Sequence, residues 1–302
     1  MTARPPSALV LPAGISARSA QAWGRDRLQS TGIEEGGLEA GLLLGHVLGL
    51  DRTGLLLHGP PVLSASETAE FQALIARRLR REPVAYLVGT RDWLDLRLSV
   101  DRNVLAPRQE TEILAGLAVE ATGWMAATRD HAPRVADVGT GSGALAIAIA
   151  RACPAAGVLA IDSGVGALRT ARENCLRLAP NRVEIVEGNL MPAHRPVDVL
   201  VANLPYIPTG ELAGLEPELS YEPRLALDGG PDGLRLIEPL LYQAREALAP
   251  GGVMLLECHH DQGARIREMA LAQLPGSAVS LHPDLAGIPR FVRVEAAPAD
   301  VR

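Results

Sequence analysis

Asp137-Val138-Gly139-Thr140-Gly141-Ser142-Gly143 is the stretch that decides the fold. An apolar run at 135–138 leads into it and another at 144–151 follows, which predicts a buried strand, a tight turn and a helix. The three glycines allow the sharp turn and let backbone N–H groups approach a ligand at the helix N-terminus. The pattern therefore predicts a ligand-binding loop at the carboxyl end of a parallel strand.

An acid follows the glycines at the distance such loops require. Asp162, about twenty residues on, ends a second predicted strand at 158–161 and is placed to accept hydrogen bonds from both hydroxyls of a ribose. With Ala144 in the third small position, the loop also satisfies the dinucleotide fingerprint, so a nicotinamide-dependent oxidoreductase stays open. A purely structural glycine turn is another alternative, which the paired acid disfavours.

Strands and helices alternate from residue 135 onward. Apolar runs at 183–186, 197–201 and 253–256 predict three more parallel strands, and alternating segments at 278–281 and 291–294 predict an antiparallel pair. The predicted fold class is α/β: a Rossmann-like domain with a seven-stranded, mostly parallel sheet covered on both faces.

A second motif, Val201-Ala202-Asn203-Leu204-Pro205-Tyr206, ends the predicted strand at 197–201. The NH2 of an amide or a nucleobase is a poor nucleophile because its lone pair is delocalised. The side-chain oxygen of Asn203 and the backbone carbonyl of Leu204 can accept its two N–H bonds and point the nitrogen at an electrophile. Pro205 stiffens the turn, and Tyr206 offers a flat face to a flat substrate. For these residues alone, a strand-ending turn with a buried tyrosine is the structural alternative.

Two features favour S-adenosylmethionine over a nicotinamide as the cofactor. A carboxylate at Asp137 suits a ligand that carries an ammonium group rather than a pyrophosphate. We place the turn at Asn203 beside the cofactor as well as the substrate. A turn that binds an amide serves methyl transfer to its nitrogen, whereas hydride transfer has no use for it. Asn189 and Leu190, after the third strand, are placed to contact the adenine.

The N-terminal third has a helical pattern instead of alternating strands and helices. We expect residues 1–14 to form a disordered tail and residues 15–82 to form a small helical domain. Within that domain, Ser64 and Glu67 are expected to cap a helix that ends at Arg81. The arginine-rich run 77–81 predicts a solvated helix face. Segments 84–89 and 93–100 predict a β-hairpin within a linker at 83–105, before a catalytic domain at 106–302.

Composition limits the function classes. The chain has 302 residues, of which 47% are hydrophobic and 21% charged, as expected of a globular protein with a sizeable core. The net charge of −6 argues against broad nucleic-acid binding. Three widely spaced cysteines form neither a disulfide framework nor a metal-ligand cluster, and no run approaches the ~18 apolar residues of a membrane span. We expect a cytoplasmic monomer with no metal, no stable nucleic-acid partner and no membrane association.

With these pieces placed, residues 36–295 resemble the glutamine-N5 methyltransferases of class-1 peptide chain release factors, the HemK or PrmC family. Besides the cofactor loop, Asp162 and the turn at Asn203, the resemblance rests on three less generic stretches. They are Pro107-Arg108-Gln109-Glu110-Thr111-Glu112, then Tyr221-Glu222-Pro223 with Leu227-Asp228-Gly229-Gly230, and the helical region ending in 77–81 before Pro83-Val84-Ala85-Tyr86. It implies methyl transfer from S-adenosylmethionine to the glutamine of the release-factor GGQ motif. It also implies that the N-terminal helices recognise the protein substrate.

The chain departs from the family pattern at two positions. The family usually has Pro where this chain has Leu204, so here packing must hold the turn. It commonly has Asp where this chain has Asn189, which keeps an acceptor for adenosine. The tetrad with leucine also occurs in adenine dimethylases of ribosomal RNA, so an N6-adenine methyltransferase is the alternative. A methyltransferase-derived binding module without turnover is also open.

Overall fold

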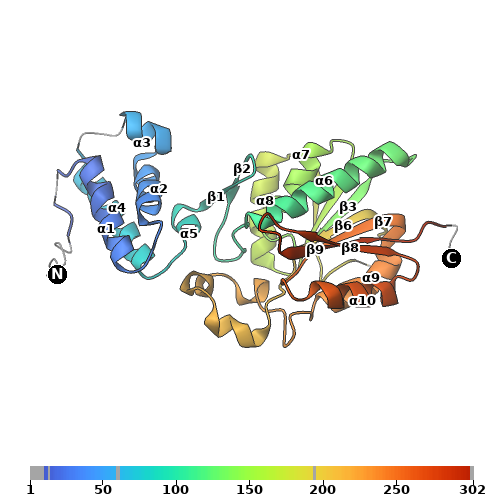
Figure 1. The fold of residues 1–302 in the computed structure, drawn as a ribbon. Coiled ribbons are helices and arrows are strands. Elements are labelled where there is room, and N and C mark those ends of the chain that lie inside the picture. The colour runs from blue at the N-terminus through green and yellow to red at the C-terminus, as the bar shows by residue number, and fades with distance from the viewer. Residues whose placement is uncertain (1–9, 13, 59–61, 193–194, 300–302) are drawn as a thin grey trace. The chain divides into compact units, whose positions relative to one another are not determined.

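The computed structural model describes residues 10–12, 14–58, 62–192 and 195–299 (Figure 1). The chain divides into two compact units between Gly89 and Thr90. The first unit is helical, with α1 (Ala17–Ser30), α2 (Gly36–Leu48), α3 (Arg52–His58), α4 (Ala65–Leu79) and α5 (Val84–Val88). Its core is built from buried side chains that include Leu28, Leu43, Leu44, Phe71 and Ile75.

Part of the predicted tail is packed rather than disordered. Residues 1–9 and 13 lie outside the described residues, but Leu11 is 3% exposed and joins the core of the first unit. Its N–H donates to Gln72 Oε1 at 3.1 Å. The prediction of disorder is therefore wrong for Leu11. The proline-rich sequence around it gives no sign that its apolar side chain packs into the core of the helical unit.

Helix α4 confirms the predicted N-terminal cap and corrects the predicted solvated face at one position, Arg78. The N–H of Glu67 donates to Ser64 Oγ, and the Glu67 carboxylate accepts from the N–H of Ser64, which completes a capping box. Arg78, however, is 4% exposed and donates to Glu39 Oε2 at 2.7 Å. Arg77 pairs with the buried Glu82. Arg78 therefore joins α4 to α2, whereas the side chain of Arg77 stays 41% exposed.

The predicted hairpin strand at 84–89 is wrong, because that segment forms α5. The N–H groups of Tyr86 and Leu87 both donate to the carbonyl of Pro83, and Gly89 ends the helix with a φ of 73°. A five-residue apolar run fits a strand or a helical turn equally well by periodicity. The hairpin lies later, in the second unit, where β1 (Thr90–Trp93) pairs antiparallel with β2 (Leu96–Ser99).

The second unit is an α/β layer structure around one seven-stranded sheet, as predicted. Its strands are β3 (Arg134–Val138), β4 (Gly157–Asp162), β5 (Val183–Glu187), β6 (Val197–Ala202), β7 (Leu248–Glu257), β8 (Ala278–Pro283) and β9 (Pro289–Glu295). Their order is β5-β4-β3-β6-β7-β9-β8. The first five in this order are mutually parallel, and β9 runs antiparallel to both of its neighbours.

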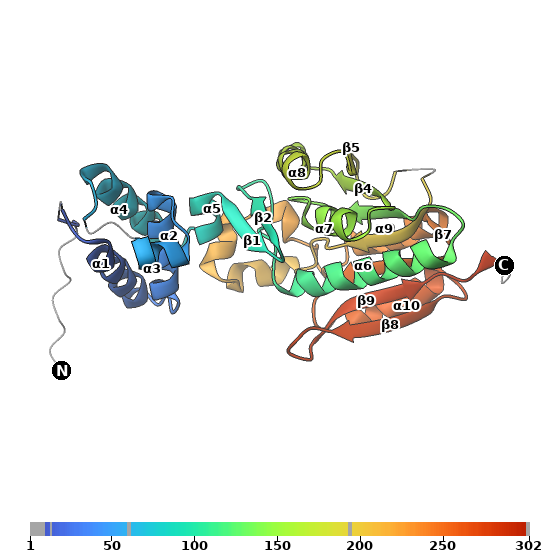
Figure 2. The same ribbon diagram turned by 90° about the horizontal axis from the view of Figure 1, so that it is seen from above.

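Side-chain alternation along the central strands places a core on each face. One core gathers Val135, Val199 and Leu255 with α6 (Glu110–Thr128), α7 (Ala144–Ala152) and α8 (Val165–Leu178), which Figure 2 shows beside the sheet. The other gathers Ala136, Leu200 and Leu256 with α9 (Ile237–Ala247) and α10 (Gly263–Gln273). Three short 3-10 turns, η1 (Thr209–Gly214), η2 (Pro217–Tyr221) and η3 (Arg224–Ala226), follow the strand β6.

The carboxyl ends of four neighbouring parallel strands, β4, β3, β6 and β7, lie at one edge of the sheet. Asp162, the glycine loop, Asn203 and Glu257 stand at or just beyond these ends. Such an edge is where open α/β sheets bind their ligands. In the described part of the chain, no helix is both long and apolar enough to cross a membrane.

Candidate active site

The glycine loop connects β3 to α7 through three left-handed residues. The φ angles of Gly139, Gly141 and Gly143 are 76°, 54° and 83°, a region that disfavours any residue with a Cβ. The N–H groups of Gly139 and Thr140 both donate to the carbonyl of Ile161 at 2.9 Å. A Cβ built on Gly141 would have its nearest neighbour 4.0 Å away, so the backbone there is open to a ligand.

Asp137 lies completely buried beneath this loop. Its Oδ2 accepts hydrogen bonds from Thr140 Oγ1 at 2.6 Å and from the N–H of Ala146 at 3.1 Å, so it ties the loop to α7. Its Oδ1 has no hydrogen-bond partner among the described residues. Burial raises the pKa of Asp137 from 3.8 to about 7. An unsatisfied buried oxygen next to the loop is an atom that a cation would stabilise.

Asp162, the predicted ribose-binding acid, lies against the loop. Its Oδ2 accepts from the N–H of Gly141 at 2.9 Å, and its Oδ1 accepts from the N–H of Gly164 at 2.8 Å. The side chain stays partly exposed, and each carboxylate oxygen has a further lone pair for a ligand hydroxyl. Asp162 therefore both shapes the loop and presents acceptors at its surface.

The residues predicted to contact adenine follow β5. The N–H of Gly188 donates to the carbonyl of Asp162 at 3.0 Å, which brings this segment next to the ribose-binding candidate. Asn189 is exposed, whereas Leu190 is buried with a φ of 65°. A left-handed conformation is costly for leucine, so the surrounding structure holds this backbone in place.

The turn at 203–206 lies directly beside the glycine loop. A Cβ on Gly139 would meet Leu204 Cδ2 at 2.9 Å. Leu204 is 4% exposed and Pro205 is buried, so packing does hold the turn in the absence of the family's usual proline. Within the described residues, no donor reaches the carbonyl of Leu204 or the Oδ1 of Asn203. Both predicted acceptors are thus free of a competing donor within the described residues.

A chain of hydrogen bonds runs behind this turn. Asn203 Nδ2 donates to Thr111 Oγ1 at 3.1 Å, and Thr111 Oγ1 donates to Glu257 Oε2 at 2.9 Å. From the other side, the Tyr206 hydroxyl donates to Glu257 Oε1 at 3.1 Å. Thr111 and Glu257 are 5% and 2% exposed, so this polar chain lies inside the protein. Burial raises the pKa of Glu257, and it raises that of Tyr206 as well.

Two of the three less generic stretches, 107–112 and 221–223 with 227–230, are hydrogen-bonded around this site. Both oxygens of Glu222 accept from Arg108 Nη2 at 2.8 Å, which joins the first stretch to the second. Asp228 accepts from Thr209 Oγ1 at 2.6 Å, just beyond the turn, and Ile207 forms an isolated bridge with Asp228. The segments far apart in the sequence are therefore bonded around one edge of the sheet.

Two buried amides fix the backbone on either side. Gln262 Nε2 donates to the carbonyl of Tyr206 at 2.8 Å, and a Cβ on Gly233 would collide with both groups. Asn174, fully buried in α8, donates to the carbonyls of Ser142 and Ser99 at 2.9 Å and accepts from the N–H of Ser99 at 2.8 Å. It thereby joins the glycine loop to the strand β2 of the hairpin.

The sequence interpretation did not single out Thr111, Glu257, Asn174 or Gln262 as individual site residues. Thr111 lies inside a stretch quoted only for its resemblance, and the acid Glu257 ends the predicted strand at 253–256. A carboxylate at the end of a buried parallel strand is a signal that could have found Glu257. Asn174 and Gln262 carry no local signal, because their partners lie far away in the sequence.

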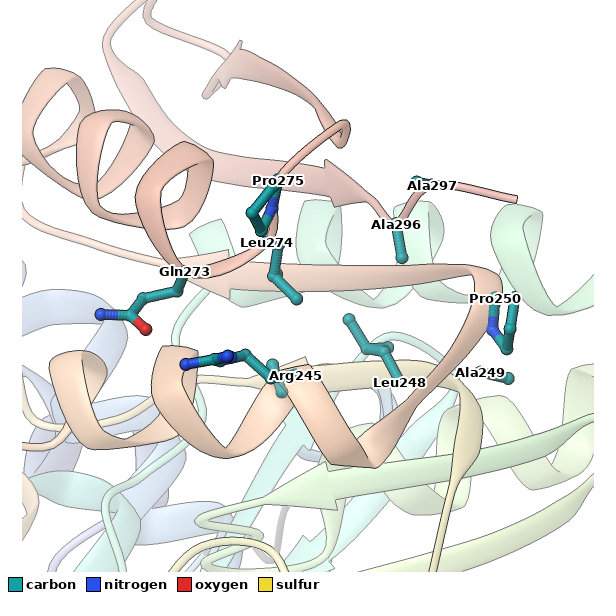
Figure 3. Close-up of a pocket in the computed structure, with 10 residues that line it drawn as sticks. Arg245, Leu248, Ala249, Pro250, Gln273, Leu274, Pro275, Ala296 and Ala297 are labelled. Carbon is teal, nitrogen blue, oxygen red and sulfur yellow. The ribbon is translucent and has the colours of Figure 1, made fainter. Parts of the chain in front are cut away.

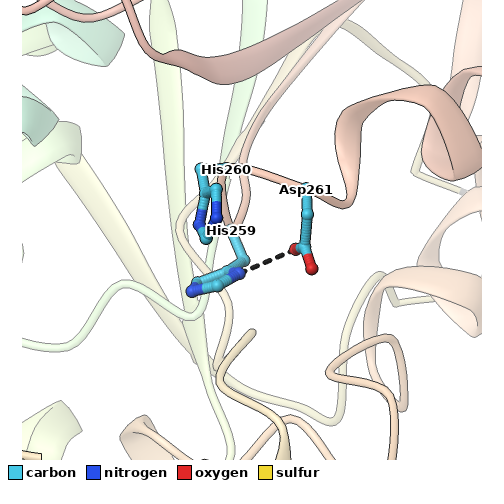
Figure 4. A group of neighbouring side chains, drawn as sticks. All are labelled: His259, His260 and Asp261. Carbon is cyan, nitrogen blue, oxygen red and sulfur yellow. Dashed lines mark hydrogen bonds and ion pairs between the residues drawn. The ribbon is translucent and has the colours of Figure 1, made fainter.

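Two other features lie near or opposite the site. His259, His260 and Asp261, just after β7, place ligand-type atoms within 4.8 Å of one another, and His259 Nδ1 lies 2.7 Å from Asp261 Oδ1 (Figure 4). That contact lowers the pKa of Asp261. A pocket of about 350 Å³, lined by Arg245, Leu248 and Leu274 among others, lies where β7 begins, at the opposite edge of the sheet (Figure 3).

Two protein-family models match parts of the chain, and a solved structure shares its fold. The family model described as "PrmC N-terminal domain" matches residues 19–89, and that of "Ribosomal protein L11 methyltransferase (PrmA)" matches residues 118–213. The structure superposes on the catalytic domain of hMettl16, solved in complex with the MAT2A 3′UTR hairpin 6, with a TM-score of 0.55 at 12% identity, over 82% of this chain and 87% of that one. The fold is that of a class I methyltransferase.

Relatives that match almost the full length of the chain then identify its family within the class I methyltransferases. A release factor glutamine methyltransferase from Deinococcus radiodurans is 40% identical over 90% of this chain and 95% of its own. One from Neisseria gonorrhoeae is 41% identical over 84% of this chain and 91% of its own. The chain belongs to the release factor glutamine methyltransferase family.

Proposed function

We propose that this enzyme transfers a methyl group from S-adenosylmethionine to the side-chain nitrogen of the glutamine in the GGQ motif of class-1 peptide chain release factors. The observation that carries the proposal is the pair of free acceptors, Asn203 Oδ1 and the carbonyl of Leu204, held beside the glycine loop. Family membership supports the same substrate.

The residues at the loop fit S-adenosylmethionine. The open backbone at Gly141 leaves room for a ligand, and Asp162 presents carboxylate oxygens for the ribose hydroxyls. The unpartnered Oδ1 of Asp137 favours a cationic group nearby, which the methionine part of this cofactor has and a pyrophosphate lacks. The cofactor supplies an electrophilic methyl group bound to a sulfonium. We place its adenine near Asn189 and Leu190.

The turn supplies orientation rather than a strong base. Asn203 Oδ1 and the Leu204 carbonyl accept the two N–H bonds of the glutamine amide, so that its nitrogen faces the methyl group. As the nitrogen–carbon bond forms and the sulfur–carbon bond breaks, positive charge grows on the N–H groups, and fixed acceptors then bind them more strongly than in the ground state. The surplus proton leaves the nitrogen for solvent. Tyr206 packs beside the amide.

The N-terminal helical unit has a separate role in this proposal. Its match to the PrmC N-terminal domain over residues 19–89 supports a part in recognising the release factor. A fragment that begins at Thr90 keeps the whole second unit and should bind S-adenosylmethionine. It should methylate an intact release factor poorly. Equal rates for the fragment and the full chain would show that these helices do not recognise the substrate.

The decisive test is transfer of a labelled methyl group from S-adenosylmethionine to a release factor, followed by mass mapping of the modified residue. The expected result is one methyl group on the glutamine nitrogen, and no label on a release factor that lacks that glutamine. Label on adenine in nucleic acid, with the release factor unmodified, would establish the N6-adenine alternative instead. Binding of NAD in place of S-adenosylmethionine would support an oxidoreductase.

A further inference from the structure

Asn203 can serve as an acceptor only if its amide points the right way. The oxygen and nitrogen of an asparagine side chain have almost the same shape, and a half-turn about the last bond exchanges them. With the nitrogen toward the substrate, Asn203 would present N–H groups to the N–H groups of a glutamine and repel it. The site therefore needs a device that favours one of the two orientations.

We propose that Thr111 and Glu257 are positioning residues that hold Asn203 with its Oδ1 toward the substrate. The inference rests on the proposed function, since it assigns the acceptor that the methyl transfer needs. It follows from the order of donors and acceptors along the buried chain Glu257–Thr111–Asn203.

The direction of each hydrogen bond is fixed from the carboxylate end. Glu257 accepts at both of its oxygens, at Oε1 from the Tyr206 hydroxyl and at Oε2 from Thr111, so Thr111 gives its single hydroxyl hydrogen to Glu257 Oε2 at 2.9 Å. The Thr111 oxygen then has only lone pairs left for Asn203. It can accept from Nδ2, at 3.1 Å, but it has nothing to donate to Oδ1. Asn203 is thus bonded in one orientation and not in the other.

Tyr206 closes the chain at its other end. Its hydroxyl donates to Glu257 Oε1 at 3.1 Å, so the carboxylate accepts from both sides. Glu257 is 2% exposed, so both of these hydrogen bonds lie away from bulk solvent. One buried carboxyl group in this way positions two of the four residues of the turn, Asn203 through Thr111 and Tyr206 directly.

The sharpest test replaces Thr111, with a control in the same helix. Thr111→Val keeps the shape of the side chain but removes the hydroxyl, whereas Thr111→Ser keeps the hydroxyl. Thr122→Val is the matched control, since Thr122 is also fully buried in α6 and its hydroxyl donates only to the backbone carbonyl of Ala118. All variants are made in the full chain and assayed for methylation of a release factor.

We expect Thr111→Val to lower kcat by about tenfold, the worth of one buried hydrogen bond. Thr111→Ser should restore most of the rate, and Thr122→Val should leave it unchanged. The Kd for S-adenosylmethionine should stay close to that of the wild type in all three. Thermal melting of each variant separates loss of rate from loss of fold, because both valine variants lose one buried hydroxyl.

Two results would overturn the inference. Turnover by folded Thr111→Val at the wild-type rate would show that Asn203 needs no help from Thr111. Turnover by Thr111→Ser as slow as that of Thr111→Val would show that the loss comes from packing and not from the hydroxyl. Failure of the proposed function is distinct from both, since the wild-type chain itself would then leave the glutamine unmodified in the same assay.

Glu257→Gln gives an independent measurement. A glutamine amide can donate to Thr111, and the threonine hydrogen is then free to bond Asn203 Oδ1, so both orientations of Asn203 become available. We expect a smaller loss in kcat than for Thr111→Val, with the affinity for S-adenosylmethionine retained. An unchanged or higher kcat in Glu257→Gln would contradict the part assigned to the carboxylate.

Discussion

Leu204 and Gly139 are in direct contact: a single Cβ on Gly139 would approach Leu204 Cδ2 to 2.9 Å. The turn at 203–206 and the glycine loop therefore pack closely against each other at this point. The φ of 76° at Gly139 adds a second constraint at the same position.

Gly139→Ala should consequently damage both cofactor binding and turnover. The new methyl group must displace Leu204, and the left-handed backbone adds about 1 kcal/mol of strain. We expect a weaker Kd for S-adenosylmethionine and a lower kcat in the same variant, measured by calorimetry and by methyl transfer. Gly116→Ala is a suitable control, because nothing lies within 4 Å of a Cβ at that exposed helical position. If kcat falls while the Kd is unchanged, the two loops are not coupled through this contact.

Asn203→Ala should slow turnover without weakening cofactor binding. It removes one of the two free acceptors, a contribution of about 3–4 kcal/mol to a preorganised site, so kcat should fall on the order of 10²–10³-fold. The Kd for S-adenosylmethionine should change little, because Asp162 and the glycine loop are untouched. Full activity in Asn203→Ala on a release factor would refute the proposed amide clamp.

Leu204→Pro tests how the turn is held. Proline keeps the backbone carbonyl, so the rate should be retained or rise. The loss of a buried leucine side chain from its contact with Gly139 should lower the free energy of unfolding by about 1–3 kcal/mol. Urea unfolding and methyl transfer on the same preparation measure both quantities. A folded but inactive Leu204→Pro would mean that this chain uses a turn of a different shape, and a substrate other than glutamine would then be favoured.

Asp162→Ala should weaken S-adenosylmethionine binding by roughly 1–3 kcal/mol, as expected when charge-assisted hydrogen bonds are lost. Some of this loss reflects the loop itself, because Asp162 also accepts from the N–H groups of Gly141 and Gly164. Asp162→Asn keeps one carbonyl-type acceptor and should lose less affinity. An unchanged Kd for Asp162→Ala, with the fold intact, would remove this residue from the site.

Binding of S-adenosylmethionine should depend on pH through Asp137. Burial raises the pKa of its carboxyl to about 7, so in the free enzyme the group is largely protonated at lower pH. A cation near the loop favours the ionised form and lowers this pKa, so binding should release protons. The affinity should therefore rise as pH increases toward 7 and level off above it.

Calorimetry in buffers of different ionisation enthalpy measures the released protons directly. Asp137→Asn cannot ionise, and its binding should lose this pH dependence. If the wild type binds S-adenosylmethionine equally well across this range without releasing protons, Asp137 does not respond to the cofactor's charge.

The parts of the structure that the sequence predicted are those with local signals. The strand before Gly139, the acid at Asp162 and the cap at Ser64 each depend on residues within a short window. The sequence predicts a strand where the helix Val84–Val88 lies, because five apolar residues show too few repeats to distinguish the two periods.

The contacts that orient the site left no such signal. Asn203 and Thr111 are 92 residues apart, and Arg108 and Glu222 are 114 apart. Hydrogen bonds between such distant residues have no spacing that a single sequence could reveal. Only the fold brings these partners together, at the common edge where parallel strands end.

Asn174 has a consequence for how such enzymes can be recombined. It hydrogen-bonds the backbone N–H and carbonyl of Ser99 and the carbonyl of Ser142. One side chain in α8 therefore holds both the hairpin strand β2 and the glycine loop. The hairpin therefore cannot be transferred to another protein without the residue in α8 that binds it. A chimaera that took its hairpin from another protein would also need an asparagine at the matching point of the host's helix, or it would lose the order of the loop along with the graft.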